Sequence, residues 1–498
     1  MNHNLIPLFV IIPLAGTFLI SLLGKRVRRL PDTLSNLCTL LLLALSLWCI
    51  PAVKASGMIV YKVGGWVPPI GICMVIDGLT CFMLVIVNVI SFLVTLYAIR
   101  YMEAYTSKEH FHTLLLLMIA GMNGVVVSGD LFNLFVFVEI ASVASYALVA
   151  FGTEHEELEA SFKYMVMGSI AASLILIGIA LLYAQTSTLN MADMARVLRA
   201  HSSPKVVLFV SILFLAGFGL KAAIVPFHWW LPDAHPAAPA PISAMLSGLL
   251  IKTLGVYALV RIVFNILDPT RILPVFLFLG ALSMLVGVFL AIGQWDFKRL
   301  LAYHSISQVG YIILGIGLGT PLGILGGLFH LLNHSIFKSL LFLNSGAVVY
   351  TTGTRDLQEL GGLREKMPVT SNTCLIASMS IAGIPPFNGF WSKLIIIIAC
   401  IQAGHPVYAL AAVVASIMTL ASFMKVQKYG FFGALKERWK GIKEVPFTMA
   451  LSMVILSLLC ITTGLLVIPG VAEHFLKSAA DVLVNGKEYA TLVFESVK

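Results

Sequence analysis

The residues of this sequence that are best suited to chemistry are charged side chains inside long apolar stretches. Glu139 is the one acidic or basic residue between Leu131 and Ala150. Five lysines share this situation: Lys163, Lys221, Lys252, Lys338 and Lys393. Six such charges facing lipid would cost on the order of 15–20 kcal/mol, at about 2.5–3.5 kcal/mol each. We therefore expect these groups to face a shared polar interior. For Lys163 and Lys338 the main alternative is snorkelling to the membrane surface.

A carboxylate and amines enclosed in one low-dielectric interior control each other's protons. An amine close to Glu139 stays protonated, whereas the same amine moved away from that carboxylate tends to release its proton. This coupling between position and protonation is what a proton pump requires. We therefore predict that Glu139 and the buried lysines carry protons.

His330, His334 and Lys338 recur at intervals of four residues, so they share one face of a predicted helix over about 12 Å. Three interpretations are open: structural hydrogen bonds, a zinc pair, or a proton relay. Zinc is the weakest, because the intervening residues 331–333 lack the glutamate of an HExxH motif and no third ligand is evident. Imidazole titrates near neutral pH, which favours a relay. His304 either extends this relay or lies at the membrane surface.

Two of the apolar stretches contain helix-breaking residues in their middles. These residues are Pro226 in the first stretch, and Pro385, Pro386 and Gly389 in the second. Proline removes a backbone donor, so at membrane depth the freed carbonyls need partners from protein or water. The Pro-Phe pairs at Pro226 and Pro386 lie 160 residues apart, and each has a buried lysine within seven residues. Interrupted helices at matching positions predict inverted repeats, whereas the alternative for each segment is an ordinary loop.

Membrane-spanning helices must position these residues, because the composition excludes a water-soluble fold. Of the 498 residues, 59% are hydrophobic and 11% charged, against about 25% charged in soluble domains, and the mean hydropathy is +0.97. Apolar windows of about 20 residues, the length that crosses a hydrocarbon core, recur along the chain. We predict about fourteen spans, at 4–23, 33–53, 76–99, 112–128, 131–151, 161–185, 206–225, 236–260, 272–292, 302–319, 322–350, 370–400, 404–424 and 445–469.

The placement of charge predicts the orientation of these spans. Basic residues follow the first window at 25–29, whereas a cleavable signal peptide carries its positive charge ahead of a shorter apolar stretch, so we expect a retained helix. With the N-terminus outside, the cytoplasmic loops hold 17 basic residues and the external segments 10, Arg261 among the latter. This bias predicts that both termini lie outside. It assigns the net charge of +9 to membrane topology and predicts no nucleic acid partner.

The sequence predicts no catalytic centre, cofactor or metal site. It contains no P-loop, no GxGxxG that opens a βαβ unit and no long hydrophilic domain. The seven cysteines are scattered without a CxxC pair, so we interpret them as small apolar side chains and not as disulfides or cluster ligands. The driving force must then come from an ion gradient or from another subunit.

Five segments, in order along the chain, resemble the proton-translocating antiporter-like subunits shared by Mrp-type Na+/H+ antiporters, respiratory complex I and membrane-bound hydrogenases. The segments are 128–139, 220–235, 298–308, 330–338 and 385–393. The resemblance covers about residues 70–430. The short C-terminal end, and the lack of an aspartate in the run after Lys163, make the chain most similar to the shorter, D-like Mrp subunit or its hydrogenase and complex I counterparts.

The resemblance implies an all-α polytopic protein of fourteen helices, with two inverted five-helix repeats and breaks in helices 7 and 12. It implies four units: helices 1–3 at 1–110, a first repeat of helices 4–8 at 111–262, a second repeat of helices 9–13 at 271–428, and a cytoplasmic loop, helix 14 and short tail at 429–498. By motif it assigns proton translocation to Glu139, Lys221, Lys252, His304, His330, His334, Lys338 and Lys393.

We therefore expect a proton-translocating subunit of a multisubunit cation/proton antiporter in the plasma membrane of a prokaryote, among lipid and other membrane subunits. The alternative is a proton- or sodium-pumping module of a redox-driven complex, with a partner arm that carries Fe–S clusters. A third interpretation is a scaffold whose buried charges only hold helices together. Both transport interpretations predict a lateral polar path with successive groups about 6–12 Å apart. The path would join Glu139, Lys221, Lys252, His330 with His334, and Lys393.

Overall fold

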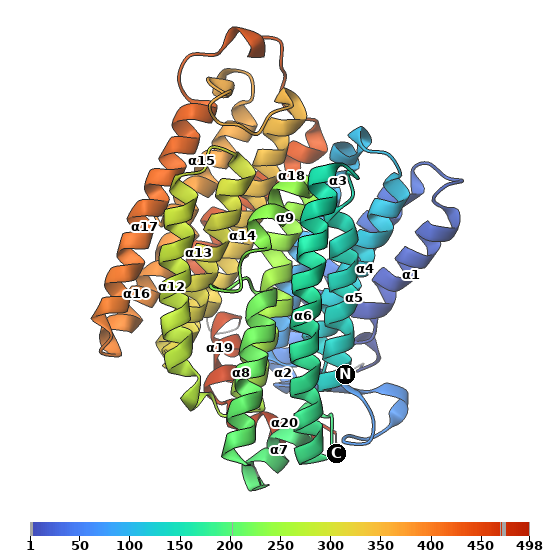
Figure 1. Ribbon diagram of the computed structural model, residues 1–498. Coiled ribbons are helices and arrows are strands. Elements are labelled where there is room, and N and C mark those ends of the chain that lie inside the picture. The colour runs from blue at the N-terminus through green and yellow to red at the C-terminus, as the bar shows by residue number, and fades with distance from the viewer. Residues whose placement is uncertain (1–2, 202, 469, 471–474, 498) are drawn as a thin grey trace.

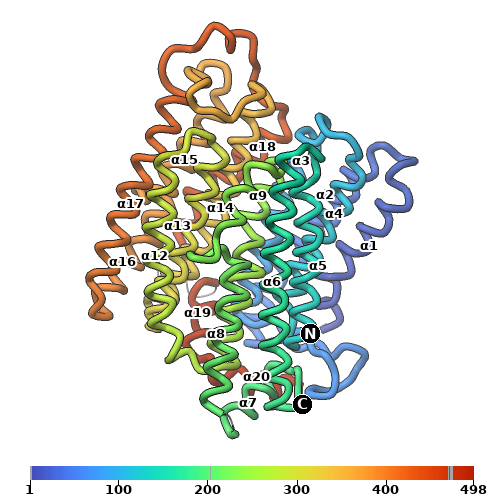
Figure 2. Tube along the Cα trace, viewed as in Figure 1, coloured from blue at the N-terminus to red at the C-terminus, as the bar shows by residue number. Residues whose placement is uncertain are grey.

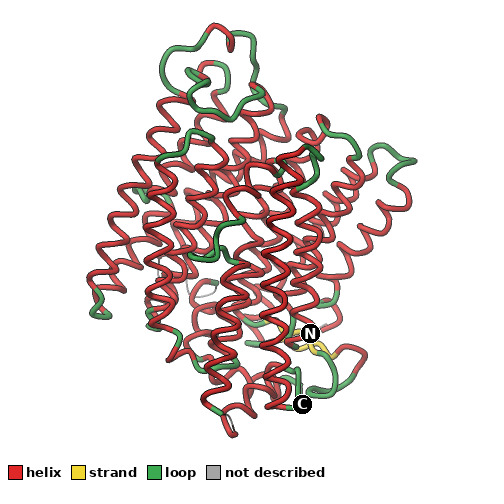
Figure 3. The backbone as a smooth tube through the Cα atoms, viewed as in Figure 1, coloured by secondary structure: helices red, strands yellow, loops and turns green. Residues whose placement is uncertain are grey.

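The computed structural model describes every residue except 1–2, 202, 469, 471–474 and 498. Long helices run side by side in one bundle, and the loops gather at its two ends (Figures 1 and 3). The two ends of the described chain lie at the same end of the bundle (Figure 2). In the described residues the one sheet is a small antiparallel pair, β1 (Ile59–Lys62) with β2 (Cys73–Ile76). Every other regular element among the residues described is a helix, and the sequence did not predict this hairpin.

The first half of the chain forms α1 (Leu8–Leu23), α2 (Leu30–Ser56), α3 (Gly78–Tyr101), α4 (Lys108–Val127), α5 (Leu131–Val149), α6 (His155–Thr186), α7 (Met191–His201), α8 (Pro204–Lys221), α9 (Leu231–Ala237), α10 (Ala240–Met245) and α11 (Ala258–Asn265). A π-helical segment, Leu246–Tyr257, joins α10 to α11. The second half forms α12 (Leu273–Ile292), α13 (Phe297–Gly317), α14 (Pro321–Thr352), α15 (Pro368–Ala382), α16 (Asn388–Gln402), α17 (Pro406–Val426), α18 (Phe447–Thr462), α19 (Leu476–Val484) and α20 (Tyr489–Glu495).

Within the described residues, twelve helices are long and apolar enough to cross a membrane. α14 has 32 residues but is not one of the twelve, because polar side chains such as His330, His334 and Lys338 lower its hydropathy. α15 and α16 have 15 residues each, which is shorter than a full span. The expected windows 322–350 and 370–400 fall on these three elements. The structure is that of a multi-pass helical membrane protein.

Polar caps set where several of the helices begin. The Asp130 carboxylate accepts a hydrogen bond from the backbone N–H of Asn133 and so starts α5. The Thr320 hydroxyl accepts one from the N–H of Gly323 at the start of α14, and Asp296 caps α13 in the same way. These bonds satisfy amide groups that a helix leaves free at its N-terminus. They fix the register in which α5, α13 and α14 present polar side chains to the interior.

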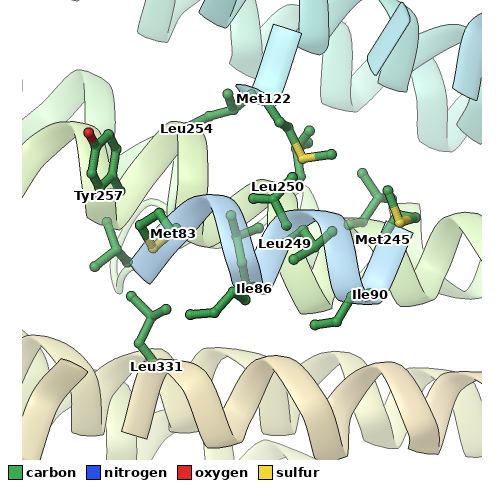
Figure 4. Close-up of a cluster of buried hydrophobic side chains, with 14 of the residues drawn as sticks. Met83, Ile86, Ile90, Met122, Met245, Leu249, Leu250, Leu254, Tyr257 and Leu331 are labelled. Atoms are coloured by element: carbon green, nitrogen blue, oxygen red, sulfur yellow. The ribbon is translucent and has the colours of Figure 1, made fainter. Parts of the chain in front are cut away.

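The helical stretch from Ala240 to Asn265 lies at the centre of the bundle, and its apolar span is fully buried. It packs between α3, α4 and α14. Figure 4 shows this packing, with labels on Met83, Ile86, Ile90, Met122, Met245, Leu249, Leu250, Leu254, Tyr257 and Leu331. Lys252 belongs to this stretch, so protein surrounds it and it does not face lipid.

Candidate functional site

Glu139 and Lys221 form an ion pair between α5 and the end of α8. The Lys221 ammonium lies 3.2 Å from a Glu139 carboxylate oxygen and donates to the hydroxyls of Ser142 at 2.8 Å and Tyr146 at 3.3 Å. The lysine side chain is 2% exposed and the glutamate 30%, so the amine is enclosed while its carboxylate partner is partly open. Glu139, Ser142 and Tyr146 lie at i, i+3 and i+7 on α5. The sequence analysis missed the two hydroxyls, although this spacing identifies one helix face.

The chain turns immediately after Lys221, the last residue of α8. Residues 222–230, which include Pro226, separate α8 from α9. The indole N–H of Trp230 donates to the carbonyl of Leu220 at 2.9 Å, so a carbonyl freed by the end of α8 has a protein partner. The interruption expected around Pro226 is present. It places the Lys221 amine at a helix C-terminus, where the helix dipole favours a cation.

Lys252 lies within the π-helical segment and is fully buried. Its ammonium donates to the backbone carbonyl of Ser247. The Ser247 hydroxyl lies 2.7 Å from that of Ser305 on α13. On the same segment, Gly248 packs so closely against α14 that a Cβ there would overlap the Ser339 hydroxyl. The helix that bears Lys252 therefore contacts both α13 and α14. Its π-helical geometry, which is common at functional sites, was not predicted.

His330 on α14 connects α13 with α16. One ring nitrogen lies 3.0 Å from the Ser392 hydroxyl and the other 3.2 Å from the side-chain carbonyl of Gln308. The rings of His330 and His334 are 6.3 Å apart, and both are fully buried. Ser392 directly precedes Lys393 on α16, so a single hydrogen bond links His330 to the helical turn that bears this lysine.

The other polar groups of the α14 stripe are buried without hydrogen bonds. In the described part of the chain, neither ring nitrogen of His334 nor the Lys338 ammonium has a hydrogen-bond partner. Both residues interact electrostatically with Lys252, and Lys338 lies 5.6 Å from the centre of the Phe342 ring. His304 on α13 is likewise fully buried, with both ring nitrogens unpartnered among these residues. Lys338 is therefore enclosed by protein and does not snorkel, and His304 does not lie at the surface.

Lys393 lies beside the second break, on α16. Pro385 and Pro386 are in the segment that separates α15 from α16. The Lys393 ammonium donates at 2.8 Å to the carbonyl of Ile381 in the last turn of α15, and lies 4.6 Å from the centre of the Tyr311 ring. A carbonyl freed by the break thus becomes the lysine's hydrogen-bond acceptor.

Two glycines allow close packing at this second break. Gly383 ends α15 with a φ of 82°, in the left-handed region, and a Cβ there would lie 3.1 Å from the Lys393 side chain. Gly389 lies in the first turn of α16 and not in the break itself. A Cβ at Gly389 would overlap the carbonyl of Ser380 on α15. Its role in the structure is the close approach of the two half-helices.

A polar network that the sequence analysis missed holds the start of α16. The Asn388 side chain donates to the Thr463 hydroxyl at 2.8 Å, and the Asn333 side chain donates to the Asn388 carbonyl at 3.0 Å. Ser380 also bonds the Asn388 side chain. Asn333 lies on α14 next to His334, so the network ties the histidine helix to both half-helices of the break.

Lys163 does not join the interior. Its side chain is 48% exposed and forms ion pairs with Glu159 at 2.8 Å and Asp233 at 3.1 Å. Of the two interpretations for this residue, snorkelling to the surface is the one that fits. Lys163 is thus distinct from the enclosed lysines.

The count of basic residues in the loops placed Arg261 in an external segment, and the structure shows that this was wrong. Arg261 is buried on α11 and forms two hydrogen bonds with the Asp77 carboxylate, at 2.6 and 2.8 Å. The two side chains are 3% and 2% exposed. Burial by itself would raise the pKa of Asp77, but the Arg261 guanidinium holds this pKa below its usual value. The pair joins residues 184 positions apart, so no local spacing pointed to it.

The site residues therefore fall into two groups. Glu139 and Lys221 form the first. Lys252, His304, His330, His334, Lys338 and Lys393 form the second, in which each histidine interacts electrostatically with two or more of the lysines. In the described residues no hydrogen bond joins Lys221 to Lys252. The helix of Lys252 nevertheless packs against the residue after Lys221, since a Cβ at Gly255 would overlap the backbone of Ala222.

A bundle of apolar helices that encloses lysines and histidines, with two lysines beside helix breaks and one of them paired to a partly exposed glutamate, defines an ion-translocating type of membrane protein. The family described as NADH:quinone oxidoreductase/Mrp antiporter, TM, matches residues 128–419. The family described as NADH-Ubiquinone oxidoreductase (complex I), chain 5 N-terminus, matches residues 66–112. The chain belongs to the NADH:quinone oxidoreductase/Mrp antiporter transmembrane family, which confirms the resemblance found in the five segments.

Individual relatives agree with this assignment. The D-type Na+/H+ antiporter subunit of Alkalihalophilus pseudofirmus is 36% identical over 438 residues, which are 87% of this chain and 88% of that protein. A chain in the structure of the Mrp complex from Dietzia sp. DQ12-45-1b superposes with a TM-score of 0.92 at 31% identity, covering 99% of this chain and 100% of that one. A chain of the membrane-bound sulfane sulfur reductase, an archaeal respiratory membrane complex, gives 0.90 at 31% identity, covering 98% and 99%.

Proposed function

We propose that the protein is a proton-translocating subunit of a multisubunit cation/proton antiporter of the Mrp type. The observation that carries this proposal is the ion pair of an enclosed Lys221 with a partly open Glu139, beside a helix break. The D-type Na+/H+ antiporter relative and the chain of the Mrp complex support it, since they match 87% and 99% of this chain.

Lys221 is the switch in this proposal. Its ammonium depends on one carboxylate and two hydroxyls of α5 for stabilisation. Because the attraction between opposite charges is strong in a low-dielectric interior and falls with distance, separation from Glu139 favours release of the proton. Glu139 is partly exposed on this chain, so a neighbouring membrane subunit can reach its carboxylate.

Beyond Lys221, we propose that protons pass along Lys252, Lys338, His334, His330 and Lys393, with His304 beside this path. The support is the set of buried nitrogens on His304, His334 and Lys338 that have no hydrogen-bond partner in the described chain. An unpaired buried polar group is costly, and internal water is its usual partner. Bridging water molecules would also carry protons between groups that are too far apart for direct hydrogen bonds.

The topology we propose has fourteen crossings. Twelve are the long apolar helices, the thirteenth is α14, and the last is the broken pair α15 and α16. An even number agrees with the position of both chain ends at one end of the bundle (Figure 2). Units 111–262 and 271–428 would be the inverted repeats, flanked by units 1–110 and 429–498. Both termini would lie outside the plasma membrane of a prokaryote.

A redox-driven complex is the second candidate. It is favoured by the match to a chain of the sulfane sulfur reductase, whose TM-score of 0.90 is close to that of the Mrp chain. The partners would then include subunits with Fe–S clusters, and the translocated ion would be a proton or Na+. Purification of the intact complex separates the two candidates, because Fe–S, nickel or flavin subunits belong only to the redox-driven one.

Everted vesicles that contain the complex test the transport proposal. Addition of Na+ should dissipate or build a pH difference, followed with a pH-sensitive dye. Lys221→Ala should abolish the response while the complex stays assembled, and Lys163→Ala is the matched control because that lysine is exposed. A Lys221→Ala complex that transports at the rate of the Lys163→Ala complex would leave the scaffold interpretation as the better one.

A further inference from the structure

The connection from α1 to α2 and the connection from α3 to α4 lie at the end of the bundle opposite the two ends of the described chain (Figure 1). Residues of these two connections line a large cavity. Its volume is about 1400 Å³. The residues that line it include five basic ones: Lys25, Arg28, Arg29, Arg100 and Lys108. No residue of the proton path lines this cavity, so it requires an explanation of its own.

The charges around the cavity are unbalanced. Two of its acidic groups are already paired, Asp32 with Lys108 at 2.8 Å and Glu103 with Arg100 at 3.0 Å. A third, Glu109, lies 3.9 Å from a neighbouring histidine. In the described residues, Lys25, Arg28 and Arg29 have no ion pair. These three cations are exposed and gathered within five positions, so they attract an anion.

Two further observations indicate what kind of anion fits. The Asn36 side-chain oxygen and the Thr448 hydroxyl line the cavity, are buried, and have no hydrogen-bond partner in the described chain. An acceptor and a hydroxyl of this kind suit a ligand that carries hydroxyl groups as well as a phosphate. The last turn of α1 and the loop after it also expose the apolar side chains of Leu22, Leu23 and Val27.

We propose that this cavity binds the headgroup of an anionic phospholipid, with its phosphate between Lys25, Arg28 and Arg29. The planar guanidinium groups bind phosphate oxygens in pairs. The headgroup hydroxyls reach Asn36 and Thr448, and the acyl chains lie along α1. Basic pockets between membrane-spanning helices bind anionic headgroups in this manner. The inference does not depend on the proton path.

Native mass spectrometry of the detergent-purified complex, after exchange into phosphatidylglycerol or phosphatidylcholine, tests the proposal. The variant is Arg28→Gln with Arg29→Gln. The matched control is Arg26→Gln with Lys443→Gln, which removes the same charge from residues that do not line the cavity. Each arginine contributes about fivefold, so retention of phosphatidylglycerol should fall about 25-fold in the variant and stay unchanged in the control. Equal retention in all three proteins would overturn the proposal.

Two further arms separate the possible ligands. Water-soluble glycerol phosphate should not displace bound phosphatidylglycerol, and displacement would show that the site takes a free phosphate. Thr33 lines the cavity, and its hydroxyl donates to the Arg29 carbonyl of its own helix turn. A photo-crosslinking amino acid at Thr33 leaves every charge in place. It should label a phospholipid. A crosslink to another protein subunit would identify a subunit contact and overturn the proposal.

Discussion

Glu139→Gln tests the switch most directly, because it removes the charge and keeps the shape. The Lys221 ammonium would remain 2% exposed, with two hydroxyls as its partners. Removal of one member of a fully buried pair costs about 3–5 kcal/mol. Because Glu139 is 30% exposed, water already screens part of its charge, so we expect about 2–3 kcal/mol. At about 1.4 kcal/mol for each factor of ten, the affinity of Lys221 for its proton should fall roughly 30- to 140-fold.

The same geometry predicts an asymmetry between the two members of the pair. Lys221→Gln leaves a carboxylate that water can reach, so it should cost less stability than Glu139→Gln, which leaves an enclosed cation. The assay is Na+-dependent proton transport in proteoliposomes, with the melting temperature of the same complexes. Both variants should lose at least about 90% of transport, and Glu139→Gln should melt lower. Wild-type transport in Glu139→Gln, or equal melting of the two variants, would refute the reasoning.

Further predictions concern the second break, the histidine relay and the buried ion pair. Lys393→Arg should impair transport almost as much as Lys393→Ala, because arginine keeps its charge but cannot release its proton; full transport would make this position an electrostatic anchor. His330→Gln keeps a hydrogen-bonding side chain but cannot carry a proton, so transport should fall at least tenfold with little change in melting temperature, and unchanged transport would indicate a structural histidine. Asp77→Asn leaves Arg261 buried without its counter-charge, so it should lower the free energy of unfolding by about 3–5 kcal/mol. Denaturation of the complex measures this loss, and a loss below about 1 kcal/mol would contradict the prediction. Because the pKa of Asp77 is held below its usual value, the ionised carboxylate stabilises the protein fully above about pH 4, and this stabilisation is lost as pH falls through the lowered pKa. The melting temperatures of wild type and Asp77→Asn should therefore converge in acid. A constant difference down to about pH 2 would contradict the pairing.

The sequence was most informative where a single residue conflicts with its surroundings. Charges such as Lys252 and Lys338 in apolar stretches are costly in lipid, and the structure encloses both. Prolines at 226, 385 and 386 disrupt helical hydrogen bonding, and all three lie in segments that separate two helices. These features follow from local physical chemistry, so neighbouring sequence is enough to predict them.

The partners of the charges were less predictable, because tertiary packing selects them. Gln308 and Ser392 bond His330 from two other helices, and Arg261 finds Asp77 across 184 positions. Periodicity gives the face of a helix but not the helix that covers it. The count of basic residues in the loops misplaced Arg261 for this reason. A basic residue near the end of an apolar window can lie in a loop or in a buried ion pair, and the sequence does not distinguish the two.

The two broken helices differ in the partner that each gives its lysine, and this difference bears on the direction of transfer. Lys221 has a carboxylate, whereas the partners of Lys393 in the described chain are a backbone carbonyl and the Tyr311 ring. A carbonyl dipole and an aromatic face stabilise a cation less than a full negative charge does. In the proposed function, the second break would therefore be the end at which protons leave.

In the proposed function, the balance of charge would give the same direction to the whole path. Glu139 is the one carboxylate in the described residues that bonds any of the enclosed lysines Lys221, Lys252, Lys338 and Lys393. Four ammonium groups opposite one carboxylate repel each other strongly at low dielectric constant. In the proposed function, a proton that reaches Lys252 would therefore favour the departure of one from Lys338 or Lys393, and His330 and His334 would offer the route. In the proposed function, entry at Lys221 and release at Lys393 would then follow from the number and position of the charged groups in the described residues.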